Sequence, residues 1–332
     1  MRLAEINDGI SAAREALRGN NVYAVTDSNV ARLYPQLFDG VKTTVIPAGE
    51  SNKNLGTVGK IISDMVEAGC DRSSTVVAVG GGVTGDTAGF AAACFMRGVK
   101  WINVPTTLLA MVDSGIGGKT GVDVGGYKNV AGAFLMPERV IVCRDFLQTL
   151  PEREWFCGCG EMIKHALLDK DIWRETTAHI DELISRGEAA YPLIEMSVRY
   201  KESVVAADFR ESGLRKRLNV GHTVGHAAER LDGFRLSHGE YVALGIVAET
   251  GMFSERLDGA FLRSVRELCG KVCRHPFPIK DASAITDTAR ADKKNSGGNI
   301  VVMLPTGEGN VDEISLTPDE FEKRLKKCLS DL

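Results

Sequence analysis

The stretch Ser74-Thr-Val-Val-Ala-Val79 is followed directly by Gly80-Gly-Gly-Val-Thr-Gly-Asp86. A continuous apolar run rich in valine is typical of a parallel strand that is buried on both faces. The glycines have the G-x-G-x-x-G spacing, and the small residues from Thr87 to Ala93 predict a helix after them. Strand, glycine turn and helix in this order predict a βαβ unit whose backbone amides can approach a pyrophosphate.

The usual second part of a dinucleotide fingerprint is missing. An acidic residue about 20 positions after the glycines normally binds the ribose. No Asp or Glu occurs between Asp86 and Asp113. A ribose would therefore have to be bound by another residue, and a glycine turn without a ligand remains an alternative interpretation of this loop.

The rest of the chain changes its pattern near Leu150. Before it, strand patterns such as Val22–Thr26 and Thr43–Ile46 alternate with helical patterns such as Leu55–Ala68. Such alternation predicts an α/β, Rossmann-like domain with a parallel sheet over residues 1–150. Helical spacing dominates afterwards, for example over Tyr191–Phe209, which predicts a mostly α-helical domain over residues 151–332. The residues from Asp319 onward predict a solvated terminal helix.

Composition excludes several classes of protein. The 332 residues suffice for one or two domains, and 44% hydrophobic and 25% charged residues are ordinary for a soluble chain. A net charge of −4 does not indicate a nucleic-acid-binding protein, because such proteins normally have a basic domain. No apolar run is long enough to cross a membrane, and acids stand where a signal peptide needs apolar residues. We therefore expect a cytoplasmic protein, with its eight scattered cysteines reduced.

The 36 glycines exceed the usual proportion of glycine in proteins, and many of them lie in stretches that also carry polar and charged residues. Between Val104 and Asn129, glycines alternate with hydroxyl groups, the carboxylate of Asp113 and the lysines Lys119 and Lys128. Glycine lets the backbone close on a ligand, and lysine supplies positive charge for a phosphate or carboxylate. This stretch predicts an anion-binding loop rather than a linker.

Three of the six histidines, His222, His226 and His238, fall within a short segment. His222 and His226 are spaced i, i+4, which places both rings on one helix face and suits zinc or a similar ion. Spacing does not choose the carboxylate ligand among Glu161, Glu229 and Glu240. His165 is a further candidate ligand, and histidines packed in the core are the alternative interpretation.

Taken together, these stretches resemble the 3-dehydroquinate synthase family of sugar-phosphate cyclases. The matching motifs are Gly80–Asp86, Phe95–Gly98, Pro105–Ala110, Val112–Ser114, Gly117–Val122, Lys128–Asn129, Gly132–Phe134, Thr149–Arg153, Glu161–Lys164, Leu218–His226 and His238–Glu240. They occur in order and with close spacing.

The resemblance implies a metal site and a cofactor site. The metal, Zn2+ or Co2+, would be bound by Glu161, His222 and His238, so that His226 would serve substrate and proton chemistry. NAD would be bound by Asp27, Asn29, Glu50, Lys53, Gly82, Val83, Thr84, Gly85, Asp86, Thr106, Thr107, Lys119, Lys128, Phe146, Leu147, Gln148 and Thr149. The family thus takes its ribose contacts from outside the position of the usual acid.

The resemblance also implies the reaction. The family converts 3-deoxy-D-arabino-heptulosonate 7-phosphate to 3-dehydroquinate and phosphate in the shikimate pathway, by NAD-dependent oxidation, phosphate β-elimination, reduction and intramolecular aldol closure. Substrate would contact Asp113, Lys119, Asn129, Lys164, Lys201, Arg215, Asn219, His226 and Lys293, or Lys294 in its place, with Arg97 reaching in from the partner of a homodimer.

Three positions depart from the family pattern. Met111, Gly115 and Asp123 stand where the family usually has Gln, Ser and Asn. Met111 and Gly115 flank Asp113, so we expect a change in the packing of that loop. The alternatives to the dehydroquinate enzyme are a sister sugar-phosphate cyclase, a metal-dependent polyol dehydrogenase of related fold, and an NAD-binding scaffold protein.

Overall fold

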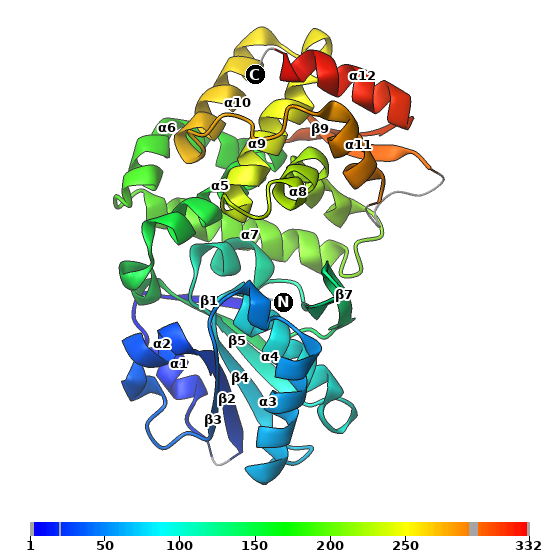
Figure 1. The fold of residues 1–332 in the computed structure, drawn as a ribbon. Helices are drawn as coiled ribbons and strands as arrows, with labels where there is room; N and C mark the ends of the chain where they lie inside the picture. Colours follow the sequence, from blue (N-terminus) through cyan, green and yellow to red (C-terminus); the bar gives the residue numbers. More distant parts are fainter. Residues whose placement is uncertain (1–2, 20, 292–297, 331–332) are drawn as a thin grey trace. The chain divides into compact units, whose positions relative to one another are not determined.

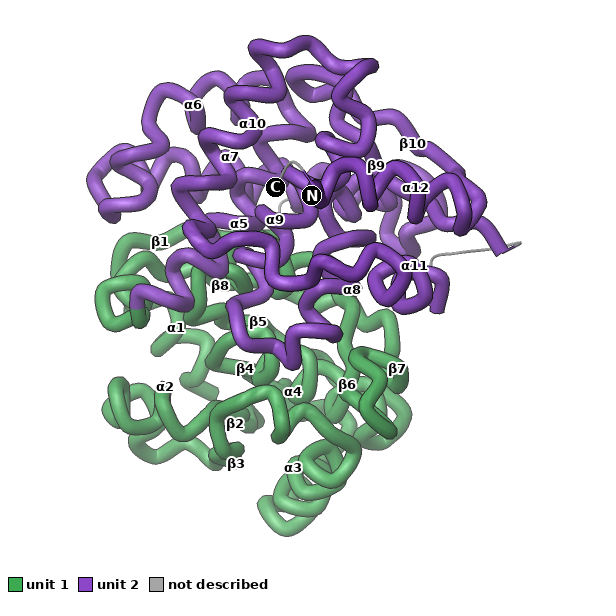
Figure 2. Tube along the Cα trace, turned by 45° about the horizontal axis from the view of Figure 1, so that its top comes forward, with its two compact units in different colours: residues 1–151 green, residues 152–332 purple. Residues whose placement is uncertain are grey.

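The computed structural model describes residues 3–19, 21–291 and 298–330. The chain divides into two compact units, Met1–Pro151 and Glu152–Leu332, which we name unit 1 and unit 2 (Figure 2). The α/β elements lie in unit 1 and most of the long helices lie in unit 2 (Figure 1).

Unit 1 contains a six-stranded sheet in the order β1-β8-β5-β4-β2-β3, in which all paired neighbours are parallel. Its strands are β1 (Ala4–Asn7), β2 (Val22–Asp27), β3 (Thr43–Ile46), β4 (Thr75–Gly80), β5 (Lys100–Pro105) and β8 (Arg139–Cys143). The valine-rich strand β4 lies inside the sheet, and Val76, Val77 and Val79 have no exposed surface. The predicted α/β class with a parallel sheet is confirmed.

Four helices accompany the sheet of unit 1: α1 (Ser11–Ala16), α2 (Ser28–Leu33), α3 (Leu55–Glu67) and α4 (Gly82–Cys94). An antiparallel ribbon of β6 (Lys119–Val124) and β7 (Tyr127–Phe134) follows a π-helical turn, Ala110–Ser114. Short 3-10 turns span Pro35–Leu37, Glu50–Asn52, Phe95–Arg97 and Arg144–Thr149. The helix that the glycine turn predicts is α4, which packs against β4 and β5 through Ala88, Ala91 and Ala92.

Unit 2 is mostly helical, as expected. Its helices are α5 (Glu152–Leu168), α6 (Lys170–Ser185), α7 (Ala190–Ala207), α8 (His222–Leu231), α9 (His238–Gly251), α10 (Gly259–Val272), α11 (Ala282–Arg290) and α12 (Pro318–Leu329), with 3-10 turns at Leu214–Asn219 and Ser254–Arg256. An antiparallel ribbon of β9 (Ile300–Gly307) and β10 (Asn310–Leu316) completes the unit.

Helix α9 is central to unit 2, because it contacts α5, α8, α10 and α12. Glycines permit its closest approaches. A Cβ atom on Gly239 would lie 2.0 Å from the carbonyl oxygen of Cys157 in α5. A Cβ atom on Gly245 would lie 1.9 Å from the carbonyl oxygen of Gly221, just before α8. The backbones of α5 and α8 therefore lie directly against α9, which a larger residue would prevent.

Two expectations need correction. The terminal helix α12 is not solvated on all sides, because Phe321 and Leu325 are fully buried. Their spacing places them on one face, which the many charged residues around them obscured in the sequence. An edge strand was expected to be missing at the N-terminal side of the sheet, but Ala4–Asn7 form the edge strand β1 against β8.

All eight cysteines lie within the described residues. All eight have free thiols, and six of them are buried. No helix within the described residues is long and apolar enough to cross a membrane.

The glycine crossing at α5 gives a prediction. Replacing Gly160 with Ala would place a Cβ atom 2.2 Å from the carbonyl oxygen of Gly239. We expect the Gly160→Ala variant to lose about 2 kcal/mol in free energy of unfolding, because the backbones of α5 and α9 must separate. Urea unfolding followed by tryptophan fluorescence measures this.

The matched control is Gly270→Ala in α10, where an added Cβ atom would meet nothing within 4 Å. This change should stabilise the protein by about 1 kcal/mol through helix propensity alone. Equal stability of Gly160→Ala and wild type would show that the α5–α9 contact is not as tight as described.

Candidate functional site

Three imidazole rings lie together in unit 2. His222 is the first residue of α8, His226 lies one turn later, and His238 is the first residue of α9. The ring centroids are 4.8 Å apart for His222 and His226, and 5.5 Å apart for each of the other two pairs. One nitrogen of each ring lies within 4.8 Å of the others. The crossing of α8 and α9 thus collects all three histidines of the sequence cluster.

A buried carboxylate from α5 joins them. Oε1 of Glu161 lies 3.1 Å from Nε2 of His238 and 3.5 Å from Nε2 of His222. The Glu161 side chain is only 1% exposed. Two imidazole nitrogens and one carboxylate oxygen therefore converge, which is a ligand set that suits a catalytic divalent ion such as zinc.

The Nδ1 atoms of His222 and His238 each face a protein acceptor. Nδ1 of His222 lies 2.9 Å from the carbonyl oxygen of Val220, and Nδ1 of His238 lies 3.2 Å from Oε2 of Glu229. Such contacts fix the tautomer and orientation of metal-binding histidines. These residues fit a metal ion.

The three candidate carboxylates thus have different positions. Glu161 faces Nε2 of both rings, whereas Glu229 holds the far side of His238. Glu240 accepts hydrogen bonds from the backbone and hydroxyl of Ser237, both at 2.8 Å, in the capping box of α9. The geometry favours Glu161 as the metal-binding carboxylate, a choice that sequence spacing did not make.

The same carboxylates determine the protonation of His238. Burial disfavours the charged ring, but the hydrogen bonds to Glu161 and Glu229 outweigh it and raise the pKa of His238 to about 9. A bound metal ion would take the place of this proton.

One basic side chain lies beside the cluster, and two more are buried in elements that contact α5. Lys164, one turn after Glu161 in α5, forms an ion pair with Oε2 of Glu161, and both side chains are 1% exposed. Lys201 in α7 and Arg215 are buried as well. Buried positive charge of this kind suits an anionic ligand.

Arg215 and Asn219 are held by a loop that the sequence analysis did not single out. Oδ2 of Asp208 accepts from the amides of Gly213 (2.7 Å) and Arg215 (3.1 Å), and Nη1 of Arg215 donates to the carbonyl of Phe209 at 2.7 Å. Asn219 donates to Oε1 of Glu211 at 3.0 Å. An Asp placed before a Ser-Gly pair was the available signal for this turn.

The further candidate ligand His165 packs against another aromatic ring. It is fully buried beside the ring of Tyr200, with centroids 5.5 Å apart.

In unit 1 the glycine turn leads straight into α4. A Cβ atom on Gly80 would lie 2.4 Å from Oγ1 of Thr84, and one on Gly82 would lie 3.1 Å from Oγ of Ser114. Gly81, at the N-cap, offers no side chain to the first amides of the helix. Close packing and an uncapped N-terminus fit the backbone binding of a pyrophosphate.

Three pairs of expected cofactor residues contact each other. Oδ2 of Asp27 accepts from Oγ1 of Thr84 at 3.1 Å, and its Oδ1 caps α2 through the amide of Asn29. Lys53 forms an ion pair with Asp86 at 2.6 Å. Burial opposes the charge of Lys53, but Asp86 outweighs it and raises the pKa of this lysine.

The remaining expected cofactor residues differ in exposure. Asn29, Glu50, Lys119 and Lys128 are exposed, and Thr106 is 7% exposed. Phe146 and Leu147 are buried, so that this segment could offer a ligand its backbone rather than these side chains. Oγ1 of Thr107 accepts from the amide of Ala110, while Gln148 and Thr149 bond to Asp145 and Tyr34.

The departures from the family pattern fit their surroundings. Met111 is fully buried, and a Cβ atom on Gly115 would lie 2.4 Å from the carbonyl oxygen of Ala110, so a serine does not fit this π-helical turn. Oδ1 of Asp123 accepts from the amide of Asn129 at 2.7 Å, where Asn129 has a φ of +51°.

Two expected substrate positions need separate mention. Arg97 is exposed at the turn before β5, with φ at +72°. Lys293 and its alternative Lys294 lie outside the described residues.

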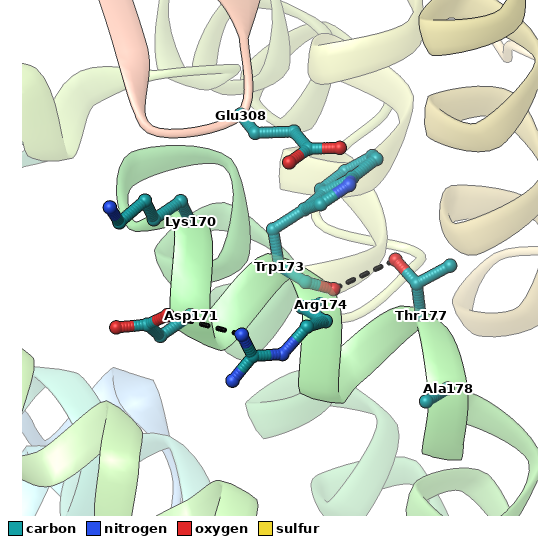
Figure 3. A pocket seen from close by; sticks show the side chains of 7 residues that line it. All are labelled: Lys170, Asp171, Trp173, Arg174, Thr177, Ala178 and Glu308. Carbon is teal, nitrogen blue, oxygen red and sulfur yellow. Dashed lines mark hydrogen bonds and ion pairs between the residues drawn. The ribbon is translucent and has the colours of Figure 1, made fainter.

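Unit 2 also has a surface pocket whose lining residues are different from those of the histidine cluster. The pocket is lined by Lys170, Asp171, Trp173, Arg174, Thr177, Ala178 and Glu308 (Figure 3). Arg174 pairs with Asp171 at 3.6 Å, and Thr177 donates to the carbonyl of Trp173. None of the seven is a residue of the histidine cluster, so this pocket is not the candidate site.

Solved structures define the class of protein. The fold is similar to that of 2-epi-5-epi-valiolone synthase from Streptomyces hygroscopicus, solved with NAD+ and Zn2+ bound, with a TM-score of 0.88 and 26% identity over 99% of this chain and 97% of that one. A 2-deoxy-scyllo-inosose synthase shares the fold, with a TM-score of 0.83, 23% identity and coverage of 98% and 96%. The class is that of the sugar-phosphate cyclases.

Sequence comparison defines the family. Models of the 3-dehydroquinate synthase N-terminal and C-terminal parts match residues 43–157 and 158–295. The chain is 39% identical to the 3-dehydroquinate synthase of Alkaliphilus metalliredigens, over 91% of this chain and 88% of that protein. The corresponding values for the Symbiobacterium thermophilum protein are 42%, 89% and 86%. The chain belongs to the 3-dehydroquinate synthase family, and the resemblance is confirmed.

The loop at Asp208 gives a second prediction. Hydrogen bonds from the amides of Gly213 and Ser212 lower the pKa of Asp208 to about 2. Its stabilising effect is therefore fully present above the unfolded pKa near 4 and is lost only as the pH falls through about 2. We expect Asp208→Ala to raise KM for an anionic substrate about 10-fold at neutral pH, with less change in kcat, because Arg215 loses its fixed backbone.

Asp281→Ala is the control, because Asp281 caps α11 through the amides of Ser283 and Ala284 without contacting the Arg215 loop. It should lower stability and leave KM unchanged. Steady-state kinetics measure KM and thermal unfolding measures stability for both variants. Equal KM values for the two variants would contradict a role of the Asp208 loop in substrate binding.

Proposed function

We propose that the protein is a 3-dehydroquinate synthase, which converts 3-deoxy-D-arabino-heptulosonate 7-phosphate to 3-dehydroquinate and phosphate. The observation that carries the proposal is the convergence of Glu161, His222 and His238 beside Lys164, in a chain of this family. The geometry joins a ligand set for a divalent ion to buried positive charge, and the substrate needs both.

The metal, Zn2+ or Co2+, would be bound by Glu161, His222 and His238. NAD would lie at the N-terminus of α4, with Asp27 and the pair of Lys53 and Asp86 close to the glycine turn through the contacts described above. When bound, NAD would supply reversible hydride transfer, and the metal ion would supply Lewis-acid polarisation of a hydroxyl oxygen.

The chain's own residues bind the substrate and move protons. The proposed contacts, as the family resemblance implies them, are Asp113, Lys119, Asn129, Lys164, Lys201, Arg215, Asn219 and His226. The positive groups would bind the carboxylate and the phosphate of the substrate. His226 is partly exposed and lies next to both other rings, so its ring can exchange a proton with a substrate hydroxyl.

We further propose a homodimer in the cytoplasm. The exposed Met96 and Arg97 both have positive φ, and the buried Phe95 anchors their turn. An arginine fixed in this way is suited to reach a partner subunit. The free thiols of all eight cysteines are consistent with a reducing compartment.

One assay tests the proposed activity. The purified protein is incubated with the heptulosonate phosphate, NAD below one equivalent of substrate, and Zn2+ or Co2+. We expect inorganic phosphate and dehydroquinate in equal amounts without accumulation of NADH, because the hydride is returned in each turnover.

Other outcomes assign other functions. Phosphate release without dehydroquinate would indicate a sister cyclase, and accumulating NADH would indicate a polyol dehydrogenase. A protein that binds the metal and NAD but shows no turnover would be a binding protein.

The ligand set gives a fourth prediction. His238→Ala removes a nitrogen that lies 3.1 Å from Glu161 and should weaken Zn2+ binding more than about 100-fold, since even changes beside a ligand cost about 10–100-fold. His226→Ala should retain the metal and lose most of its turnover. Metal content after dialysis against a buffered zinc concentration measures metal binding by both variants, and phosphate release measures their turnover. Metal loss in His226→Ala with retention in His238→Ala would exchange the two roles.

A further inference from the structure

Helix α8 begins without a local cap. The residue before His222 is Gly221, with φ at +74° and ψ at −4°, and it has no side chain to accept a hydrogen bond from the first turn. The amides of a first helical turn have no partner inside the helix. In α2 and α10 the preceding aspartates, Asp27 and Asp258, accept from such amides.

A carboxylate from another helix takes this role in α8. Glu249, near the end of α9, has no exposed surface. Its Oε2 accepts from the amide of Gly221 and its Oε1 from the amide of Val224, both at 2.9 Å. The two oxygens thus hold the backbone on either side of His222, and a negative charge at a helix N-terminus is favourable.

Backbone packing restricts α8 at the same place. A Cβ atom on Gly221 would lie 2.7 Å from the carbonyl oxygen of Val242 in α9, and one on Gly225 would lie 2.7 Å from that of Tyr241. The start of α8 therefore lies against the backbone of α9 while Glu249 holds its amides. Neither element can shift along the other without breaking these buried hydrogen bonds.

We propose that Glu249 is a positioning residue that fixes His222 relative to His238. Helix α9 begins with His238 and presents Glu249 about three turns later. One helix therefore carries one imidazole and holds the backbone that carries the other. Its consequence for metal binding rests on the proposed function, in which both imidazoles bind the ion.

The substitution Glu249→Gln isolates this role. Glutamine keeps the size of the side chain but replaces one acceptor oxygen by an NH2 group, which would face an amide donor. The site is fully buried, so no water from the surface can satisfy the amide that loses its acceptor. The first turn of α8 should then shift, and His222 with it.

Three measurements test the proposal: amide hydrogen exchange of Gly221 and Val224 without metal, Co2+ affinity, and the visible spectrum of bound Co2+. We expect Glu249→Gln to lose exchange protection at the amide that faces the NH2 group, to bind Co2+ about 10–100-fold more weakly, and to give an altered Co2+ spectrum. Glu249→Asp, whose shorter side chain cannot reach both amides, serves if the Gln variant does not fold.

The matched control is Asp258→Ala, which removes the cap of α10, another helix packed against α9. It should lower the unfolding temperature while Co2+ affinity and spectrum stay at wild-type values. A Glu249 variant that is destabilised but keeps the wild-type spectrum, affinity and exchange would overturn the proposal. Wild-type protein that binds no Co2+ would count against the proposed function instead, and amide exchange would still decide the role of Glu249.

Discussion

The closeness of α5, α8 and α9 is the constraint on which the candidate metal site depends. Backbone meets backbone at these crossings, with Gly239 against Cys157 and Gly245 against Gly221. At such short distances the first residues of α8 and α9 project toward the same point, and Glu161 reaches them from α5. Because each ligand candidate comes from a different helix, a small separation of the helices would spread the donor atoms beyond the reach of one ion.

Around this point, buried charges are balanced by specific partners. Glu161 faces two imidazoles with one oxygen and Lys164 with the other, and Glu229 holds the far nitrogen of His238. An unpaired charge at such depth would be costly. The contacts that offset the cost of burying these charges also fix the direction of each donor atom. The same contacts therefore determine both the electrostatics and the geometry of the site.

The sequence predicted much of the fold for clear reasons. The valine run of β4 and the glycine turn before α4 are local patterns, and parallel pairing follows from strands that alternate with helices. Strand β1 and the buried face of α12 were missed, because four residues give little periodicity and Phe321 and Leu325 stand among charged neighbours. The histidine cluster was visible because two ligand candidates lie one helical turn apart.

By itself the sequence determined the α/β class of the first half, the helical second half, the glycine turn, and the family to which the chain belongs. Spacing left three carboxylates open and the resemblance implied Glu161, whereas the tertiary structure shows that Glu161 faces the imidazoles. Only the tertiary structure decided why serine does not fit at Gly115 and that Glu249 caps α8. These depend on contacts between residues far apart in the chain: Glu161 and His238 are 77 positions apart, and Gly221 and Glu249 are 28 apart. No local pattern records such distances, because they arise only when helices pack.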